Sequence, residues 1–259
     1  MYFIDVQGTL IEDNTKQPVR GAVAFIDRLN TEGTPYMVIT NSTKNPSDEF
    51  LGYLNAIGLA IPPEKYLDPL MMLESRIGKS EKIAAYGSEP FLNVVRAMGY
   101  MLDYRCPDAV LIAIKEDFTA EEYAQMIEFL LAGARLIGMH ETSLYVKNHK
   151  RYPGVGAILK MLEFATSVPY AVVGKPSGPF FDEALRRLRL QHPGARYADV
   201  TIISDDVKGD LVGAQKLGMK GVFVLSGKIR NADEILPSLD PAERPSAVYS
   251  DMQEVLEKL

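Results

Sequence analysis

Two aspartates that directly follow apolar runs are the residues of this sequence best suited to chemistry. Tyr2–Ile4 leads into Asp5, and 200–203 leads into Asp205. Short apolar runs of this kind are typical of buried strands, and open α/β sheets bind their ligands at the carboxyl ends of such strands. An isolated aspartate there is more often a turn residue, so Asp5 gains meaning only from the residues that accompany it.

Polar residues follow four predicted core strands, and their types suit phosphoryl transfer. Two carboxylates can share one hard cation such as Mg²⁺, and a carboxylate that attacks phosphorus forms an aspartyl-phosphate. A threonine hydroxyl, backbone N–H groups and a lysine ammonium can hold the phosphoryl oxygens. The four clusters are Asp5 with Gln7, Thr40 with Asn41, Lys175 alone, and Asp205 with Asp206 and Asp210.

Alternating strand and helix patterns supply the elements that must position these residues. We expect strands at 2–4, 35–40, 83–86, 109–114, 135–138, 170–173, 200–203 and 221–225 and near 248. We expect helices at 19–30, 46–58, 89–98, 119–131, 153–166, 179–190, 207–217 and 252–259, with a short one before 78 and a hairpin or flap at 12–17. Thr119 and Glu122 predict a capping box. This order indicates parallel sheets with helical crossovers.

The pattern divides the chain into two predicted domains. Residues 1–78 and 171–259 form one discontinuous α/β domain, and residues 79–170 form a second, smaller α/β domain inserted into it. The length of 259 residues suits one large domain or a domain with an inserted partner.

Composition narrows the partners and the compartment. The net charge of −6 offers no attraction for nucleic acid or acidic membranes, and no apolar run is long enough to cross a bilayer. The single cysteine, Cys106, excludes an internal disulfide. A strand that begins beside Met1 leaves no room for a signal peptide, so we expect a cytoplasmic protein without a nucleic-acid or membrane partner.

The four polar clusters together resemble the motifs of the haloacid dehalogenase superfamily. Any one of them alone would be weak evidence, but all four occur in the family's order and on strand ends. The matching segments are Asp5-Val-Gln7-Gly8-Thr9-Leu10, Ile39-Thr40-Asn41-Ser42, Gly174-Lys175-Pro176 and Ser204-Asp205-Asp206-Val-Lys-Gly209-Asp210.

The inserted domain resembles the class II cap of NagD-type phosphatases. The resemblance implies a Rossmann-like core with a parallel sheet and helices on both faces, plus the smaller α/β cap at 79–170. It also implies a Mg²⁺-dependent hydrolase that acts on a small phosphorylated molecule or pyrophosphate. A homo-oligomer is expected as well, and a dimer is the favoured form.

The resemblance assigns the metal-binding roles. Asp5 would be both the nucleophile and a metal ligand. The main-chain carbonyl of Gln7 and the side chain of Asp205 would complete the protein ligands. Asp210 would be a further ligand or a support, and Asp206 would support the metal-bound water.

The remaining roles concern the phosphate and the substrate. By the same resemblance Thr40, Asn41 and Lys175 would bind the phosphate, and Lys175 would also bridge it to Asp5. His140 and Lys147 fall where a cap faces the site, so we expect them as candidate substrate contacts.

Gln7 departs from the family pattern. Most phosphatases of the superfamily have a second aspartate there, which protonates the leaving oxygen and later activates water. Glutamine cannot trade a proton, and general acid–base help is worth ~10²–10⁴-fold. The hydrolysis of pyrophosphate, activated aryl phosphates and P–N compounds should therefore be slowed least. The branch resembling phospholysine phosphohistidine inorganic pyrophosphate phosphatase also lacks this acid, and short matches such as Gly227-Lys228 point to it.

Other functions stay open beside the phosphatase. Loss of the acid at Gln7 also suits a catalytically weak or inactive protein that binds phosphorylated metabolites. A phosphotransferase or mutase would share the aspartyl intermediate. A dinucleotide site is not supported, because Gly154-Val-Gly156 lacks the third glycine of that fingerprint.

Overall fold

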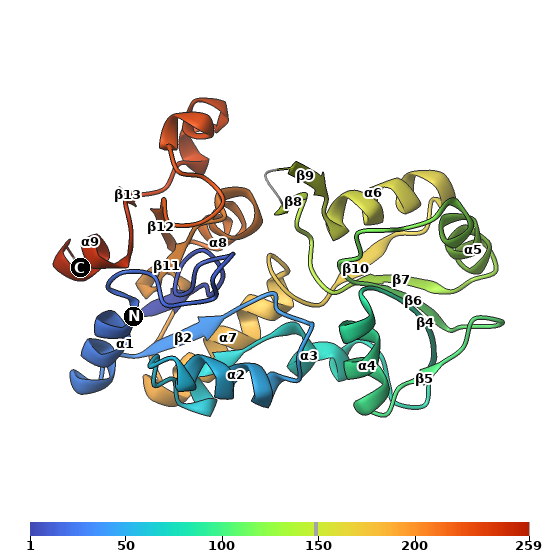
Figure 1. The fold of residues 1–259 in the computed structure, drawn as a ribbon, viewed down its shortest axis with the longest axis horizontal. Coiled ribbons are helices and arrows are strands. Elements are labelled where there is room, and N and C mark those ends of the chain that lie inside the picture. The colour runs from blue at the N-terminus through green and yellow to red at the C-terminus, as the bar shows by residue number, and fades with distance from the viewer. Residues whose placement is uncertain (148–149, 259) are drawn as a thin grey trace. The chain divides into compact units, whose positions relative to one another are not determined.

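The chain forms two compact units in a computed structural model that describes residues 1–147 and 150–258, with only the backbone described for Val146 and Lys147 (Figure 1). The first unit comprises Met1–Thr40, Asp48–Leu67 and Phe181–Leu259, and the second comprises Asn41–Ser47 and Asp68–Phe180. The domain boundaries expected at 79 and 170 lie inside the second unit. The assignment of 79–170 as an inserted cap stays a prediction.

A six-stranded parallel sheet organises the first unit, as the alternating pattern predicted. Its strands run in the order β13-β12-β11-β1-β2-β3. Their bounds are β1 (Tyr2–Ile4), β2 (Tyr36–Ile39), β3 (Tyr66–Leu67), β11 (Thr201–Ser204), β12 (Lys220–Val224) and β13 (Ala247–Tyr249).

The chain changes direction across this sheet between β1 and β11. After β1 it passes through α1 (Ala22–Thr31) to β2 on one side, and after β11 it passes through α8 (Val212–Lys216) to β12 on the other. Ile4 pairs in register with Ile203. A topological switch point of this kind opens a crevice at the carboxyl ends of the two central strands.

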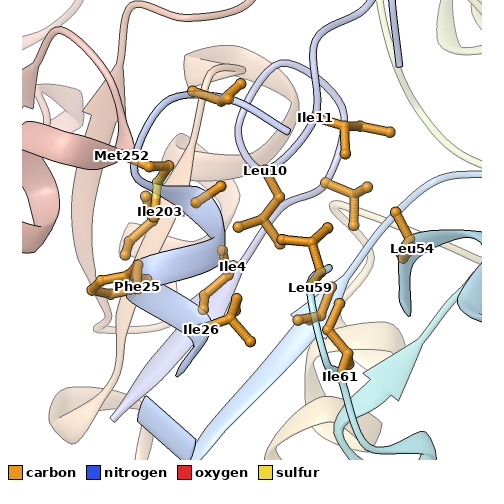
Figure 2. Packing of buried hydrophobic residues seen from close by; sticks show 14 of the residues in the cluster. Ile4, Leu10, Ile11, Phe25, Ile26, Leu54, Leu59, Ile61, Ile203 and Met252 are labelled. Atoms are coloured by element: carbon orange, nitrogen blue, oxygen red, sulfur yellow. The ribbon is translucent and has the colours of Figure 1, made fainter. Parts of the chain in front are cut away.

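Apolar packing on one face of the sheet fixes this arrangement (Figure 2). Ile4 and Ile203 of the central strands pack with Phe25 and Ile26 of α1. The same cluster takes residues from α2 (Ser47–Ala56) and α9 (Met252–Lys258). On the opposite face Phe3 stacks against Phe181 of α7 (Gly178–Gln191), with ring centroids 6.5 Å apart. The central strands are therefore covered on both faces, as expected of a parallel sheet.

The second unit contains a five-stranded parallel sheet of its own. The strand order is β10-β7-β6-β4-β5. The bounds are β4 (Lys82–Tyr86), β5 (Met101–Leu102), β6 (Ala109–Ile112), β7 (Arg135–Gly138) and β10 (Tyr170–Val172). A separate antiparallel hairpin joins β8 (Leu144–Lys147) to β9 (Lys150–Pro153).

Helices cover both faces of this second sheet. One face packs α4 (Glu89–Ala97) through Phe91 against Ile83 and Leu111, together with the short α3 (Pro69–Met72). The other face packs α5 (Ala120–Leu131) and α6 (Val155–Thr166) against Val110 and Ile112. The predicted capping box is confirmed, because the Glu122 N–H donates to Thr119 Oγ1 at 3.1 Å and the Thr119 N–H to the Glu122 carboxylate at 2.8 Å.

The uninterrupted helix expected at 207–217 is wrong in its first half. Val207–Leu211 instead form a π-helical turn, and α8 begins only at Val212. The Asp210 and Leu211 N–H groups both donate to the carbonyl of Asp206, at 3.0 and 3.3 Å, and the second bond spans five residues. π-Helical turns are often found at functional sites.

None of the helices formed by residues 1–147 and 150–258 combines the length and the apolar character needed to cross a membrane.

Candidate active site

Asp5 and Asp205 lie at the switch point of the first sheet, which we call the carboxylate edge. Asp5 directly follows β1, and its N–H donates to the carbonyl of Ile203 in β11 at 2.9 Å. Asp205 directly follows β11. Both side chains are buried, with exposed fractions of 5% and 1%. The predicted pair of carboxylates is thus brought to neighbouring strands.

Two glycines leave room for the Asp205 carboxylate. A Cβ atom added at Gly8 would lie 2.4 Å from Asp205 Oδ2, and one added at Gly227 would lie 1.9 Å from it. Gly8 also has a φ of +76°, which side-chain-bearing residues rarely adopt. The backbone therefore closes around this carboxylate more tightly than any other residue at Gly8 or Gly227 would allow.

Hydroxyl groups connect the loops around the two carboxylates. Thr9 Oγ1 donates to Asp5 Oδ2 at 3.4 Å and accepts from the Asp205 N–H at 3.1 Å. Ser226 Oγ donates to the carbonyl of Gly8 at 2.7 Å. The loops after β1, β11 and β12 are held together by these bonds, so the carboxylates are positioned by three strands at once.

Gln7 and Thr40, which the sequence placed in different motifs, contact each other. Thr40 Oγ1 donates to Gln7 Oε1 at 2.7 Å, and Thr40 is fully buried. Because the amide oxygen accepts this bond, the Gln7 Nε2 group is the part of the side chain left to donate.

Asp206 and Asp210 are both fixed by the turn that follows β11. Ser204 Oγ donates to Asp210 Oδ2 at 2.7 Å and accepts from the Asp206 N–H at 3.0 Å. The Gly209 N–H donates to Asp206 Oδ1 at 2.8 Å. These contacts suit supporting positions around a metal site, and the roles of both aspartates stay predictions.

Lys228 belongs to this edge and was not expected there. Its Nζ forms an ion pair with Asp206, and its N–H donates to Asp205 Oδ2 at 2.8 Å. Burial alone would lower the pKa of the Lys228 ammonium, but Asp206 and Asp205 outweigh it and raise that pKa. The available signal was its place after β12, the strand next to β11.

The donor set fits a divalent cation. Asp205 Oδ1 is buried and has no hydrogen-bond partner within the described chain. Burial raises the pKa of the Asp205 carboxyl well above its usual value; Lys228 opposes this rise and Asp5 adds to it. A buried carboxylate oxygen without a partner is costly, and a cation is one group that satisfies it.

No group of three or more His, Cys, Asp or Glu side chains is placed to hold a metal ion on its own within 1–147 and 150–258. The predicted ligand set mixes the carboxylates of Asp5 and Asp205 with the main-chain carbonyl of Gln7. Oxygen donors of this kind suit Mg²⁺, which usually keeps several waters.

Asn41 and Lys175 belong to the second unit and contact each other there. The Lys175 N–H donates to Asn41 Oδ1 at 2.9 Å, and Asn41 Nδ2 donates to the carbonyl of Lys175 at 3.4 Å. Lys175 is buried, with 1% exposed. A Cβ atom at Gly174 would lie 2.5 Å from Asn41 Oδ1, so the glycine permits this approach.

The two expected cap contacts also lie in the second unit. His140 is buried, with 2% exposed, and its Nδ1 accepts from the Thr142 N–H at 3.4 Å. Lys147 ends β8, and its side chain lies outside the described residues. Their contact with substrate stays a prediction.

A parallel α/β sheet with paired carboxylates at its switch point defines the class of protein, and sequence comparison defines the family. Residues 2–101 match the family described as "Haloacid dehalogenase-like hydrolase", and residues 172–255 match the one described as HAD-hydrolase-like. The Bos taurus "Haloacid dehalogenase-like hydrolase domain-containing protein 2" is 30% identical over 98% of this chain and 96% of its own length. The chain belongs to the haloacid dehalogenase-like hydrolases.

A second relative bears on the branch of the family. The Danio rerio "Phospholysine phosphohistidine inorganic pyrophosphate phosphatase" is 27% identical, and the match covers 99% of this chain and 92% of that protein. The similarity confirms the resemblance that the motifs indicated.

Solved structures with the same fold cover nearly the whole chain. The p-nitrophenyl phosphatase from Archaeoglobus fulgidus superposes with a TM-score of 0.82 at 23% identity and covers 100% of this chain and 98% of its own. NagD from Escherichia coli K-12 has a TM-score of 0.74 at 22% identity over 98% and 96%. The glycerol phosphate phosphatase Rv1692 from Mycobacterium tuberculosis, in complex with magnesium, has a TM-score of 0.72 at 22% identity over 97% and 75%. These likenesses confirm the predicted NagD-type α/β fold.

Proposed function

We propose that this protein is a Mg²⁺-dependent phosphatase that forms an aspartyl-phosphate on Asp5. The observation that carries the proposal is the pair of buried carboxylates at the carboxylate edge, one of which has a buried oxygen without a partner. A nucleophile and a cation-binding carboxylate on adjacent strands are what an attack on phosphorus requires.

The residues of the carboxylate edge have separate roles in this proposal. Asp5 attacks phosphorus and expels the leaving group, and water then attacks the aspartyl-phosphate to release phosphate and restore the carboxylate. Asp5, Asp205 and the Gln7 carbonyl would hold the metal, which would supply charge neutralisation at the phosphoryl group. Lys228 keeps Asp206 in place and offsets the negative charge of the edge.

The phosphate contacts follow from the family motifs. Thr40, Asn41 and Lys175 bind the phosphoryl oxygens in this proposal, because a hydroxyl, an amide and an ammonium group are good donors to an anion. Lys175 also offsets repulsion between the phosphate and Asp5. Asp210 and Asp206 support the metal.

Gln7 directs the substrate class. Its amide oxygen accepts from Thr40, and an amide cannot protonate a departing alkoxide. We therefore infer that the substrate has a leaving group that departs without that proton: pyrophosphate, an activated aryl phosphate or a P–N compound. The name of the zebrafish relative, which includes phospholysine, phosphohistidine and inorganic pyrophosphate, supports this class.

Further parts of the proposal concern the organisation and location of the protein. Residues 79–170 act as an inserted cap that admits a small phosphorylated molecule, with His140 and Lys147 as its candidate contacts. The protein is a cytoplasmic homodimer. The exposed free thiol of Cys106 supports a reducing compartment.

A substrate panel tests the proposal. Purified protein is assayed for phosphate release from pyrophosphate, p-nitrophenyl phosphate, phosphohistidine, sugar phosphates and nucleotides, with Mg²⁺ and with a chelator. We expect turnover of the first three classes only with the metal. Preference for sugar phosphates over aryl phosphates would contradict the role given to Gln7.

A second candidate function rests on the same residue. With no proton donor at Gln7, the protein could bind phosphorylated metabolites and release no phosphate. Ligands that raise the melting temperature, without any turnover across the panel, would favour this function. A phosphotransferase, the third function, would give phosphorylated products when acceptor alcohols are present.

A further inference from the structure

A cavity of about 630 Å³ lies entirely within the second unit. Tyr86 and Ser88 at the end of β4, Ile114 and Lys115 after β6, and Gln125 of α5 are among the residues that line it. Its volume is that of pockets that hold small molecules. We call it the second-unit cavity.

The cavity lies at the switch point of the second sheet. β4 and β6 are neighbours, and the chain leaves β4 through α4 to β5 on one side and leaves β6 through α5 to β7 on the other. α4 and α5 also pack on opposite faces of the sheet. Their first turns therefore diverge from the same two strand ends, which is the geometry that opens ligand crevices in parallel sheets.

The side-chain hydroxyl of Ser88 stands out among the groups that line the cavity. Its Oγ is buried and makes no hydrogen bond within residues 1–147 and 150–258. Ser88 occupies the N-cap position of α4, yet its side chain makes no capping bond. A buried hydroxyl that neither caps its helix nor finds another partner is costly, so a bound ligand is its natural partner.

The ring of Tyr104 supplies a surface for a planar group, because Tyr104 is 38% exposed while Tyr86 behind it is 4% exposed. Tyr86 and Tyr104 meet edge to face, with centroids 5.8 Å apart and an interplanar angle of 86°. Each hydroxyl is already engaged, because Tyr86 donates to Gln125 Oε1 and Tyr104 to the carbonyl of Ala85, both at 2.7 Å. Burial raises the pKa of both tyrosines, so they stay neutral, and ring contact is what Tyr104 offers.

Negative charge prevails around the cavity. Four carboxylates and two ammonium groups line it: Glu89, Glu116, Asp117 and Glu122, with Lys44 and Lys115. The Lys115 ammonium is paired with Glu122, and Glu89 is paired with Arg96 outside the lining. Glu116 and Asp117 are exposed on the loop before α5. Such a lining attracts a cation and disfavours phosphate.

We propose that the second-unit cavity binds a small cation that carries a planar ring, such as an aromatic amine. The ring packs against Tyr104, a polar group of the ligand bonds to Ser88, and the ammonium faces Asp117. This site is separate from the carboxylate edge and goes beyond phosphatase activity.

Tyramine, titrated into the full chain without metal by calorimetry, tests the proposal. The matched anionic probe is 3-(4-hydroxyphenyl)propionate, which keeps the ring and replaces the amine with a carboxylate. We expect one saturable tyramine site per chain and at least tenfold weaker binding of the anion. Equal binding of the two probes, or no tyramine binding at millimolar concentration, would overturn the proposal.

Variants locate the site. Ser88→Ala should weaken tyramine binding about fivefold, the usual scale of one hydrogen bond, and should not lower the melting temperature, because it removes an unpaired buried hydroxyl and no cap is lost. Asp117→Asn should weaken it about tenfold. The control Glu128→Gln removes an exposed carboxylate of α5 that does not line the cavity, and it should bind as the wild type does.

Two further results would contradict the site. One is tyramine binding that is unchanged in both Ser88→Ala and Asp117→Asn. The other is loss of tyramine binding in Asp5→Asn, which would assign the ligand to the carboxylate edge. Because the measurement needs neither metal nor turnover, its outcome is independent of the proposed phosphatase activity.

Discussion

The carboxylate edge and the second-unit cavity each lie at the switch point of a parallel sheet. The first holds two buried carboxylates, whereas the second is a cavity. At the first, Asp5 and Asp205 follow their strands directly, and Gly8 and Gly227 let the backbone close around Asp205. At the second, Tyr86 and Gly87 lead into α4, and the loop after β6 continues to Thr119 before α5 begins. At the first position two glycines let the backbone close around a carboxylate, whereas at the second the lining residues leave space for a ligand.

The carboxylate edge and the second-unit cavity also share one feature, a buried polar atom without a hydrogen-bond partner. Only three buried side-chain atoms in the described chain have no hydrogen-bond partner, and two of them are Asp205 Oδ1 and Ser88 Oγ. One is a carboxylate oxygen and the other a hydroxyl. The first therefore suits a metal ion, and the second suits a neutral or cationic organic group.

Removing the nucleophile should distinguish the carboxylate edge from the second-unit cavity most strongly. Asp5→Asn should lower the turnover of p-nitrophenyl phosphate by roughly 10⁴-fold or more, the scale seen when a catalytic nucleophile is lost. Tyramine binding should stay unchanged, since Asp5 is no part of the second-unit cavity. Steady-state kinetics and calorimetry on one preparation check both outcomes, and turnover that survives would remove Asp5 from its role.

Restoring the proton donor should sharpen what Gln7 does. Gln7→Asp should raise the rate at which alkyl phosphates phosphorylate Asp5 by ~10²–10⁴-fold and change that first-step rate for p-nitrophenyl phosphate much less, because only the alkoxide needs a proton. The ratio of the two rates is the measurement. Equal gains on both substrates would show that the variant acts through something other than the leaving group.

Neutralising Asp205 should have opposite effects on stability without and with metal. Asp205→Asn removes a buried charge that lacks a full set of partners, so the metal-free protein should gain about 1–3 kcal/mol in free energy of unfolding. Mg²⁺ at a hundredfold excess over Kd should then stabilise the wild type by about 2.7 kcal/mol and the variant hardly at all. Denaturant titrations with and without Mg²⁺ measure both.

Asp27→Asn is the matched control for this comparison, because Asp27 is exposed on α1 of the same unit. Its stability should follow that of the wild type in both conditions. A metal-free loss of stability in Asp205→Asn would show that the carboxylate is satisfied without a cation.

The smallest expected effect concerns acid stability away from both edges. Hydrogen bonds from Arg186, and then from Arg187, lower the pKa of Glu183 in α7 to about 2. A depressed carboxyl pKa stabilises the fold above the usual pKa of about 4.5, and this contribution disappears as the pH falls towards 2. Glu183→Gln should therefore cost less than about 1 kcal/mol at pH 6, because solvent screens these pairs.

Denaturation of wild type and Glu183→Gln at pH 6 and pH 3 measures this difference. The gap between the two proteins should narrow at the lower pH. A difference in unfolding free energy that is the same at both pH values would show that it does not come from the ion pairs of Glu183.

Sequence periodicity predicted the long helices and buried strands, because these elements have enough residues to show a repeat. Two-residue strands such as β3 and β5 show none and could not be found. The π-helical turn at Val207–Leu211 depends on the carbonyl of Asp206 accepting two N–H groups, and no spacing of apolar residues reveals that.

The candidate site was predictable where chemistry sits at a strand end. Asp5 and Asp205 followed from that rule, and the contact between Gln7 and Thr40 agrees with motifs on neighbouring strands. Lys228 was missed, because its pairing with Asp206 depends on the order of β11 and β12 in the sheet. The second-unit cavity likewise requires the strand order and the directions of two helices.

The most direct test of the central claim is a rapid-quench measurement with a ³²P-labelled aryl phosphate and Mg²⁺. Gln7 lacks the basic group that would activate water for the second step, so the aspartyl-phosphate should outlast its formation. We predict a burst of acid-stable label on the wild-type chain that approaches one phosphate per chain, a smaller burst in Gln7→Asp and none in Asp5→Asn. Phosphate release without labelled protein in wild type, or label that persists in Asp5→Asn, would contradict the account.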